Sequence, residues 1–263
     1  MNGKIIDCPW RGRFPVLVIA HRGLSALAPE NTLSAFKKAI EADSDMIELD
    51  IRFSKDHEVV IIHDDGLERT TTGRGKVGDY DLKELKNLDA GSWFGAEFAG
   101  ESIPTLSELL RLACGKVLLN IEIKKGRSAP FPITDLSEEA LALVQQAGMI
   151  DQVLFSSFHP PALEIIREKK TSARIALLFH RSWSSISEIT RGQRYTTLNL
   201  RARHLTEGKI ASLHEQGMKV NAYTVNAEER MRDYIRWRVD GIITNRADRL
   251  IRILQQNPSV PSP

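Results

Sequence analysis

Short apolar segments rich in β-branched residues recur along the chain, and this recurrence limits its possible folds more than any other feature. These segments are residues 16–20, 46–53, 58–62, 117–123, 153–158, 174–179, 196–201, 219–225 and 241–244. In most of the intervening stretches, apolar residues recur with the spacing of an amphipathic helix. An alternation of strand and helix that repeats about eight times is typical of a parallel sheet covered by helices.

The number of repeats favours a TIM (β/α)₈ barrel over an open doubly wound sheet. Dinucleotide-binding open sheets carry a Gly-x-Gly-x-x-Gly motif after the first strand, and no such motif follows the first apolar segment here. The length of 263 residues also fits, because such barrels have about 250 residues. We therefore expect residues 1–263 to form a single α/β barrel domain.

Capping signals predict where two of the helices begin. Asp135 with Glu138 three residues later has the spacing of a capping box, and Gly148 predicts the end of that helix. Asn226 with Glu229 has the same spacing. We expect helices to begin at these two positions.

The segment from about residue 64 to 104 interrupts the alternation. It is rich in Gly, Thr, Asp and Lys and predicts only one short helix, around residues 82–88. Because connections in compact domains are usually much shorter, we expect a small functional insertion, or a lid, after the second strand region. An inert surface excursion is the alternative.

Composition excludes several classes of partner. A net charge of +2 is too small to indicate nucleic-acid binding. No segment reaches the roughly 18 apolar residues that a membrane span needs, so we expect no stable membrane association. Cys8 and Cys114 lack metal-type spacing. Cleavage of a signal peptide at the first apolar segment would remove the first strand, so we expect no signal peptide there. We therefore expect a cytoplasmic protein, of undetermined oligomeric state.

Carboxylates follow the strand period in two of the apolar segments. Because side chains alternate across a strand, Glu48 and Asp50 should point to one side and into a barrel, as should Asn120, Glu122 and Lys124. Buried unpaired carboxylates cost several kcal/mol each, so these groups need a cation. Three carboxylates favour Mg²⁺ or Ca²⁺ over zinc, although Lys124 could neutralise Glu122 without a metal.

Two histidines and two cations stand near these carboxylates in the predicted fold. His21 and His63 follow apolar strands, where a barrel has its active site, and they could serve as acid and base. Arg22 and Lys124 add positive charge beside a metal, which indicates a phosphate-bearing substrate. Each histidine alone could instead be structural. Together these residues predict phosphodiester cleavage.

Further motifs stand in order over about residues 16–250. They are His21-Arg22-Gly23, Pro29-Glu30-Asn31-Thr32, Glu48-Leu49-Asp50, His63-Asp64, Leu67-Glu68-Arg69-Thr70-Thr71, Gly91-Ser92-Trp93-Phe94, Ile103-Pro104-Thr105-Leu106, Asn120-Ile121-Glu122-Ile123-Lys124, Ser156-Ser157-Phe158, Tyr223-Thr224-Val225-Asn226 and Asp240-Gly241-Ile242-Ile243-Thr244. This ordered set resembles the glycerophosphodiester phosphodiesterase family, in its short bacterial cytosolic form.

The resemblance implies a TIM-barrel hydrolase that uses a divalent metal ion, Mg²⁺ or Ca²⁺. Its substrates would be glycerophosphodiesters such as deacylated phospholipids, and its products sn-glycerol 3-phosphate and an alcohol. The resemblance assigns Glu48, Asp50 and Glu122 as metal ligands. It assigns His21 and His63 as the general acid and base, and it implies that the insertion shapes the glycerol end of the pocket.

The resemblance also assigns groups that bind the substrate. Arg22 and Lys124 would hold the phosphate, and Glu30 would support the loop after the first strand. Tyr223 stands where many family members have Trp, so it would be either an aromatic platform for the substrate or a ring that closes the barrel top. Asn245 stands where many members have Asp, which puts a helper role there in doubt.

Two other functions are compatible with the same motifs. A phosphodiesterase acting on intact lipids, like phospholipase C or D, would need an apolar or basic rim, for which the insertion offers only Trp93, Phe94 and Phe98. A catalytically inactive barrel that binds phosphoesters is the second alternative. The completeness of the predicted site argues against it.

Overall fold

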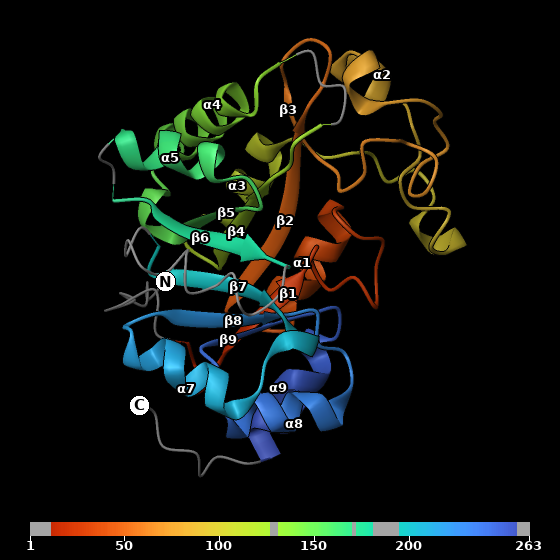
Figure 1. Cartoon of the computed structure of the whole chain (residues 1–263). Helices are drawn as coiled ribbons and strands as arrows, with labels where there is room; N and C mark the ends of the chain where they lie inside the picture. The colour runs from red at the N-terminus through yellow and green to blue at the C-terminus, as the bar shows by residue number, and fades with distance from the viewer. Residues whose placement is uncertain (1–11, 127–130, 170–171, 181–194, 257–263) are drawn as a thin grey trace.

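The computed structural model describes residues 12–126, 131–169, 172–180 and 195–256. Within this part of the chain, parallel strands form a closed barrel with helices around it (Figure 1). The barrel strands are β1 (Leu17–His21), β2 (Met46–Phe53), β4 (Leu118–Ile123), β5 (Val153–Ser157), β6 (Arg174–Phe179), β7 (Thr197–Arg201), β8 (Lys219–Tyr223) and β9 (Gly241–Thr244). Strand β1 pairs with both β2 and β9, which closes the barrel and confirms the predicted TIM fold.

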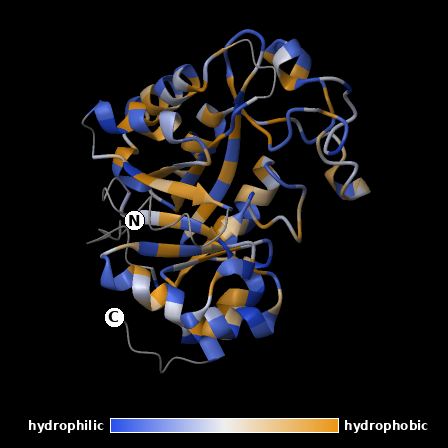
Figure 2. Cartoon of the chain, in the orientation of Figure 1, coloured by the Kyte–Doolittle hydropathy of each residue, from blue (hydrophilic) through white to orange (hydrophobic). Residues whose placement is uncertain are grey.

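The helices bury apolar faces against the outside of the barrel. They are α1 (Leu33–Glu41), α3 (Leu106–Ala113), α4 (Ile133–Gln146), α5 (Pro160–Glu168), α7 (Glu207–Glu215), α8 (Glu228–Arg236) and α9 (Ala247–Gln256). One continuous cluster of buried residues joins these faces to the outward side chains of the strands, with Phe36, Leu49, Phe155 and Tyr234 among its members. In Figure 2 strands such as β2 alternate between hydrophobic and hydrophilic residues, and the helices carry residues of both kinds.

The predicted insertion is an ordered excursion with a small apolar core of its own. Strand β3 (Val59–Ile61) runs antiparallel to β2, and the chain then forms α2 (Leu82–Leu85) before it returns to the barrel at α3. The short helix expected in this segment is therefore present. Its core consists of Val60, Ile62, Leu67, Val77, Leu85, Ala90 and Ile103. In Figure 1 this segment lies to one side of the barrel.

Both predicted helix starts are wrong. Helix α4 begins at Ile133 after Pro132, so Asp135 lies inside its first turn, where a negative charge is also favourable. Helix α8 begins at Glu228 after Ala227. The Asn226 side chain accepts hydrogen bonds from the end of β9 and its neighbour instead. Gly148, in the left-handed region with φ of 66°, does follow the end of α4 as predicted.

The barrel interior changes character along its axis. Near the amino ends of the strands it is filled by an apolar layer of Ile19, Met46, Leu118, Leu154, Ala176 and Ile243. Two residues farther along the strands, the same inward positions carry polar side chains such as Glu48, Asn120 and Ser156. In the part of the chain described, no helix is long and apolar enough to cross a membrane.

Candidate active site

Three carboxylates converge at the carboxyl ends of β2 and β4. In the parallel register of these strands, Asp50 lies beside Glu122, and Glu48 lies beside Asn120 on the same inward face. One oxygen from each of the three carboxylates lies within 4.8 Å of the others, and all three residues are buried. The structure therefore brings together the three residues that the sequence predicts as metal ligands.

Burial leaves two of these carboxylates without full compensation. It raises the pKa of Glu48 well above its usual range, and the neighbouring carboxylates of Asp50 and Glu122 raise it further. Burial also raises the pKa of Glu122 to about 7, although the Lys124 ammonium opposes the change. A buried group of hard carboxylate oxygens with excess negative charge suits a divalent cation.

Asp50 differs from its two neighbours because cations surround it. Burial raises its pKa, but the nearby charges of Lys124 and Arg22 outweigh that effect and hold it below the usual range. Asn31 Nδ2 also donates to Asp50 Oδ2 at 2.9 Å. The other oxygen, Oδ1, is buried and receives no hydrogen bond, with Lys124 Nζ 3.3 Å away. That oxygen is available to a metal ion, so the residues present fit the implied cofactor.

Arg22 is held in a tight turn directly after β1. Its backbone has a φ of 56°, in the left-handed region, and its N–H donates to Glu48 Oε2 at 3.0 Å. Its guanidinium donates to Glu30 Oε1 at 2.7 Å and lies 3.3 Å from Asp50 Oδ2. Gly23 completes the turn with a φ of 82°, and a Cβ there would lie 2.7 Å from Ala35 of α1. The packing of α1 therefore requires this glycine and fixes the direction of Arg22.

Lys124 extends from the end of β4 over the carboxylates. Its Nζ lies 2.7 Å from Glu122 Oε1 and 3.3 Å from Asp50 Oδ1. Burial lowers its pKa, but these two carboxylates more than offset that effect, so it stays charged. Lys124 makes no ion pair with Glu48 within the described residues. It thus partly neutralises the cluster, as the sequence alternative allowed. For Glu48, the charge and the backbone N–H of Arg22 do not offset the effect of burial on its pKa.

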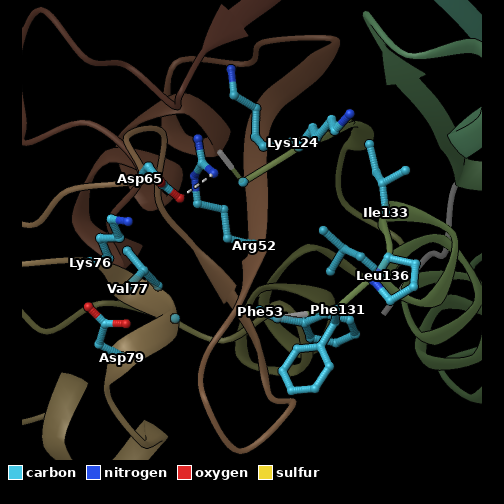
Figure 3. A pocket seen from close by; sticks show the side chains of 14 residues that line it. Arg52, Phe53, Asp65, Lys76, Val77, Asp79, Lys124, Phe131, Ile133 and Leu136 are labelled. Carbon is cyan, nitrogen blue, oxygen red and sulfur yellow. Dashed lines mark hydrogen bonds and ion pairs between the residues drawn. The ribbon is translucent and has the colours of Figure 1, made fainter. Parts of the chain in front are cut away.

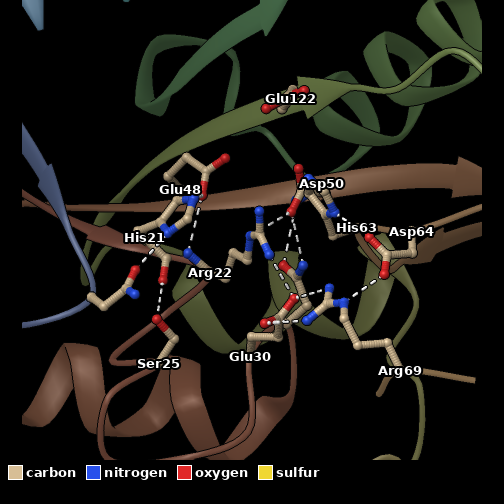
Figure 4. A network of polar contacts seen from close by, with 12 residues as sticks. His21, Arg22, Ser25, Glu30, Glu48, Asp50, His63, Asp64, Arg69 and Glu122 are labelled. Carbon is tan, nitrogen blue, oxygen red and sulfur yellow. Dashed lines mark hydrogen bonds and ion pairs between the residues drawn. The ribbon is translucent and has the colours of Figure 1, made fainter. Parts of the chain in front are cut away.

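His21 points from the end of β1 toward the carboxylates (Figure 4). Its Nδ1 lies 2.6 Å from Asn245 Oδ1, and its Nε2 lies 3.9 Å from Glu48 Oε2. A carbonyl oxygen can only accept a hydrogen bond, so Nδ1 carries the proton and Nε2 carries the lone pair. Burial, with a smaller effect from the charge of Arg22, lowers the pKa of His21 to about 4. Asn245, whose role the sequence left in doubt, therefore orients this ring.

His63 has a charged partner instead of a neutral one. Its Nδ1 lies 2.5 Å from Asp64 Oδ1, and Arg69 Nε donates to the second oxygen of the same carboxylate at 2.5 Å. Burial raises the pKa of Asp64, but these two hydrogen bonds outweigh it and lower the value to about 2. His63 is thus paired with a carboxylate that stays ionised, at the edge of the barrel where the insertion begins.

Tyr223 lies on the other side of the barrel mouth, at the end of β8. Its hydroxyl donates to the backbone carbonyl of Phe179 at 3.2 Å, and its ring packs edge-on against Phe158. Burial raises its pKa above the usual value. Among the described residues, no hydrogen bond or ion pair joins it to the charged cluster. The structure thus brings seven of the predicted site residues into one network and places Tyr223 apart from it.

Sequence reasoning missed Arg52, which supports His63 through its backbone. The Arg52 guanidinium donates twice to the His63 carbonyl, at 3.0 and 2.7 Å, and pairs with Asp65 at 3.3 Å. The strand period that selected Glu48 and Asp50 also points Arg52 inward, so this signal was present in the sequence. Figure 3 shows Arg52 and Lys124 at the wall of a neighbouring cavity of about 240 Å³.

The chain matches known proteins over most of its length. A model of the glycerophosphoryl diester phosphodiesterase family matches residues 21–249. A glycerophosphodiester phosphodiesterase from Caldanaerobacter subterraneus subsp. tengcongensis is 36% identical over 241 residues, which cover 91% of this chain and 98% of the relative.

Solved structures of similar proteins share the fold. A phosphodiesterase from Oleispira antarctica, in complex with the product sn-glycerol-3-phosphate, is 30% identical, with a TM-score of 0.81 over 92% of this chain and 97% of that one. A glycerophosphodiester phosphodiesterase from Agrobacterium tumefaciens is 27% identical, with a TM-score of 0.76 over 90% and 99% of the two chains. The chain therefore belongs to the glycerophosphoryl diester phosphodiesterase family, and it is a hydrolase of glycerophosphodiesters.

Proposed function

We propose that this enzyme cleaves glycerophosphodiesters to sn-glycerol 3-phosphate and an alcohol with the help of Mg²⁺ or Ca²⁺. The observation that carries this proposal is the convergence of three buried carboxylates between two histidines at the barrel mouth. The Oleispira antarctica relative in complex with sn-glycerol-3-phosphate supports the product. Deacylated phospholipids are the substrate class that fits this reaction, which would place the enzyme in lipid and glycerol metabolism.

Glu48, Asp50 and Glu122 would hold the metal ion. When bound, the ion would supply positive charge that stabilises the negative charge developing on the phosphate during cleavage. The raised pKa values of Glu48 and Glu122 support this assignment, because a bound cation would replace the protons that otherwise neutralise these buried carboxylates. Carboxylate oxygens are suitable ligands for both Mg²⁺ and Ca²⁺, and titration of the metal-free enzyme with each ion distinguishes them.

The partners of the two histidines suggest different roles. His21 presents the Nε2 lone pair because Asn245 takes the proton of Nδ1, which suits a general base acting on the attacking oxygen. Burial lowers the pKa of His63, and the hydrogen bond to the Asp64 carboxylate opposes that lowering, so Asp64 supports the protonated ring that a general acid needs to protonate the departing alkoxide. The attacking oxygen belongs either to water or to the glycerol hydroxyl of the substrate. Only attack by the hydroxyl forms a cyclic phosphate, so detection of this transient species by ³¹P NMR distinguishes the two routes.

The remaining predicted residues would bind the substrate. Arg22 presents a guanidinium and Lys124 an ammonium at the edge of the carboxylate cluster, and both would contact phosphate oxygens. Tyr223, half-buried on the opposite side of the mouth, would offer its ring to the glycerol or head-group carbons. We further propose that the chain acts as a single domain, with the insertion of about residues 64–104 shaping the glycerol end of the pocket.

We also propose that the enzyme works in the cytoplasm on small substrates without stable membrane association. An exposed free thiol at Cys114 supports a reducing compartment. Cell fractionation with an antibody against the native chain tests this, and recovery in the membrane fraction would contradict it.

Product identification tests the reaction itself. Purified enzyme is incubated with glycerophosphocholine or glycerophosphoethanolamine, and the phosphorus-containing product is identified by ³¹P NMR. We expect sn-glycerol 3-phosphate from both substrates, because the glycerol phosphate half is common to them. Release of choline phosphate instead would place the cleaved bond on the other side of phosphorus and overturn the proposal. Cleavage of intact phospholipid in vesicles, with no cleavage of the deacylated compounds, would favour the phospholipase alternative.

A further inference from the structure

Arg69 of the insertion binds two carboxylates at once. Its Nε donates to Asp64 Oδ2 at 2.5 Å, and its Nη1 and Nη2 donate to Glu30 Oε2 and Oε1 at 2.9 and 2.7 Å (Figure 4). The contact with Glu30 is a two-bond fork, a geometry that a planar guanidinium provides and an ammonium does not. Three donors of a single side chain therefore fix two acidic residues from different loops.

Each of these carboxylates also contacts a predicted site residue. Asp64 uses its other oxygen for Nδ1 of His63 at 2.5 Å. Glu30 Oε1 also accepts a hydrogen bond from Nη1 of Arg22 at 2.7 Å. Arg69 is therefore separated by a single carboxylate from a proposed acid–base group on one side and from a proposed phosphate-binding group on the other.

We propose that Arg69 is a positioning residue that sets the orientation of both His63 and Arg22. The inference rests on the proposed function, since it assumes the roles given above to these two residues. Arg69 anchors the two carboxylates, and they in turn hold the imidazole and the guanidinium that face the substrate. The insertion thereby takes part in assembling the active site from outside the barrel.

Surface exposure separates this role from a purely structural one. The Arg69 side chain is 45% exposed, and partly exposed ion pairs contribute little to the free energy of folding. Misplacement of a reacting group by about 1 Å can nevertheless cost roughly 100-fold in rate. Loss of Arg69 should therefore lower activity far more than stability.

The two contacts of Arg69 should affect different kinetic constants. Orientation of His63 through Asp64 concerns proton transfer, so its loss should lower kcat. Orientation of Arg22 through Glu30 concerns phosphate binding, so its loss should raise KM and weaken the binding of sn-glycerol 3-phosphate. A residue that merely stabilised the fold would produce no such division.

The first experiment compares R69Q and R69K with the matched control R230Q. Arg230 has the same side-chain exposure of 45% and also binds a carboxylate, that of Asp233, but contacts none of the network residues. We expect R69Q to lower kcat/KM by about 10- to 100-fold, R69K to lie between R69Q and wild type, and R230Q to match wild type. Thermal unfolding should shift no more in R69Q than in R230Q, because Arg230 also donates to the Tyr234 hydroxyl and lies over the rings of Tyr234 and Trp237. Equal activity of R69Q and R230Q would overturn the proposal.

Double-mutant cycles test the path of the effect. If Arg69 acts through Asp64, the kcat of D64N/R69Q should lie within about 2-fold of that of D64N, and the KM of E30Q/R69Q should likewise match that of E30Q. Independent, multiplicative effects in both cycles would contradict the proposed path. The affinity of the same proteins for sn-glycerol 3-phosphate is measured by calorimetry. Absence of turnover by the wild-type enzyme would overturn the proposed function. The effect of R69Q on this affinity would still decide the role of Arg69.

Discussion

The two sides of the barrel mouth are equally buried but differ in charge. On the side of β1, β2 and β4, the inward residues Glu48, Asp50 and Glu122 carry carboxylates beside histidines and cations. On the side of β7 and β8, the inward residues are Asn199 and Asn221, whose amides bond to each other at 2.9 Å. Asn199 is 0% exposed and Asp50 is 1% exposed, so burial alone does not explain the difference.

The difference in charge supports the proposal that the reaction takes place on the charged side. The two amides share one hydrogen bond and carry no net charge, whereas neighbouring carboxylates repel each other and lose more solvation energy on burial. Replacing such a charged cluster by well-packed neutral residues often stabilises a protein. The charged side is therefore the costly one to keep, and we propose that binding of a cation and a phosphate is the benefit that offsets this cost.

Removal of either histidine should have the largest effect on activity. H21A and H63A should each lower kcat by about 10²- to 10⁴-fold, because each loses a group that transfers a proton. The two losses should differ with the leaving group. A nitrophenyl glycerophosphodiester needs no acid, so H63A should lose much less activity on it than on glycerophosphocholine, while H21A should lose the same on both. The reverse pattern would exchange the acid and base roles.

A substitution on the charged side of the barrel mouth should weaken metal binding far more than one on the neutral side. E122Q should weaken Mg²⁺ binding by more than about 100-fold, since even residues that only support ligands contribute about 10- to 100-fold. N221A on the neutral side should change the affinity by less than about 3-fold, although it leaves Asn199 unpaired and should cost about 1–3 kcal/mol of stability. Isothermal titration calorimetry of the folded proteins measures both affinities. Equal weakening by the two substitutions would contradict a metal site on the charged side.

Metal binding should strengthen as the pH rises. The pKa of Glu122 is about 7 and that of Glu48 is raised, so protons compete with the metal ion below these values. Affinity for Mg²⁺ should therefore increase from pH 6 toward pH 8 by up to about 10-fold per pH unit for each proton released, and proton release should be detectable in buffers of different ionisation enthalpy. A pH-independent affinity over this range would show that the carboxylates are already ionised without metal.

Exchange of the histidine partners should have a smaller effect. D64N replaces the charged partner of His63 and should lower kcat by about 10-fold, because the protonated ring loses its support. N245D gives His21 a charged partner in the same place and should change kcat by less than about 3-fold above pH 7. Steady-state kinetics at pH 8 compares them. A larger loss in N245D than in D64N would mean that His21, not His63, is the ring that depends on its partner.

The smallest effect is expected on the neutral side. Y223F keeps the ring and removes the hydrogen bond to Phe179, which should cost about 0.5–1.5 kcal/mol of stability and leave kcat/KM within about 3-fold. Y223A removes the ring and should raise KM more than Y223F does if the ring contacts the substrate. Equal KM values for the two variants would leave Tyr223 only the structural role of closing the barrel top.

The two-residue period of the strands predicted the strand residues of the charged side, but the contacts between its loops could not be predicted in the same way. It placed Glu48, Asp50 and Glu122 on one inward face, because alternation within a strand is fixed by backbone geometry. It did not predict that Arg69 would bind Glu30, since a contact between two loops depends on the positions that the whole fold gives to residues far apart in the sequence.

The two wrong helix starts have a similar explanation. A capping-box spacing is a local signal, and in the folded chain the Asn226 side chain accepts hydrogen bonds from Thr244 and Asn245 at the end of β9 instead of capping α8. Pro132 moved the start of α4 away from Asp135 because its ring fixes a backbone angle suited to a helix entrance. Asn245 was underestimated for another reason, since an amide can orient a histidine without the charge of Asp.

Metal dependence of turnover tests the central claim most directly. Enzyme stripped with EDTA and dialysed is titrated with Mg²⁺ or Ca²⁺ while glycerophosphocholine cleavage and metal binding are followed in parallel. We predict no measurable turnover without metal, and recovery that follows the occupancy of one site and is lost in E122Q. Full turnover by the stripped enzyme would contradict the account, because the charged side of the barrel mouth would then work through Arg22 and Lys124 alone.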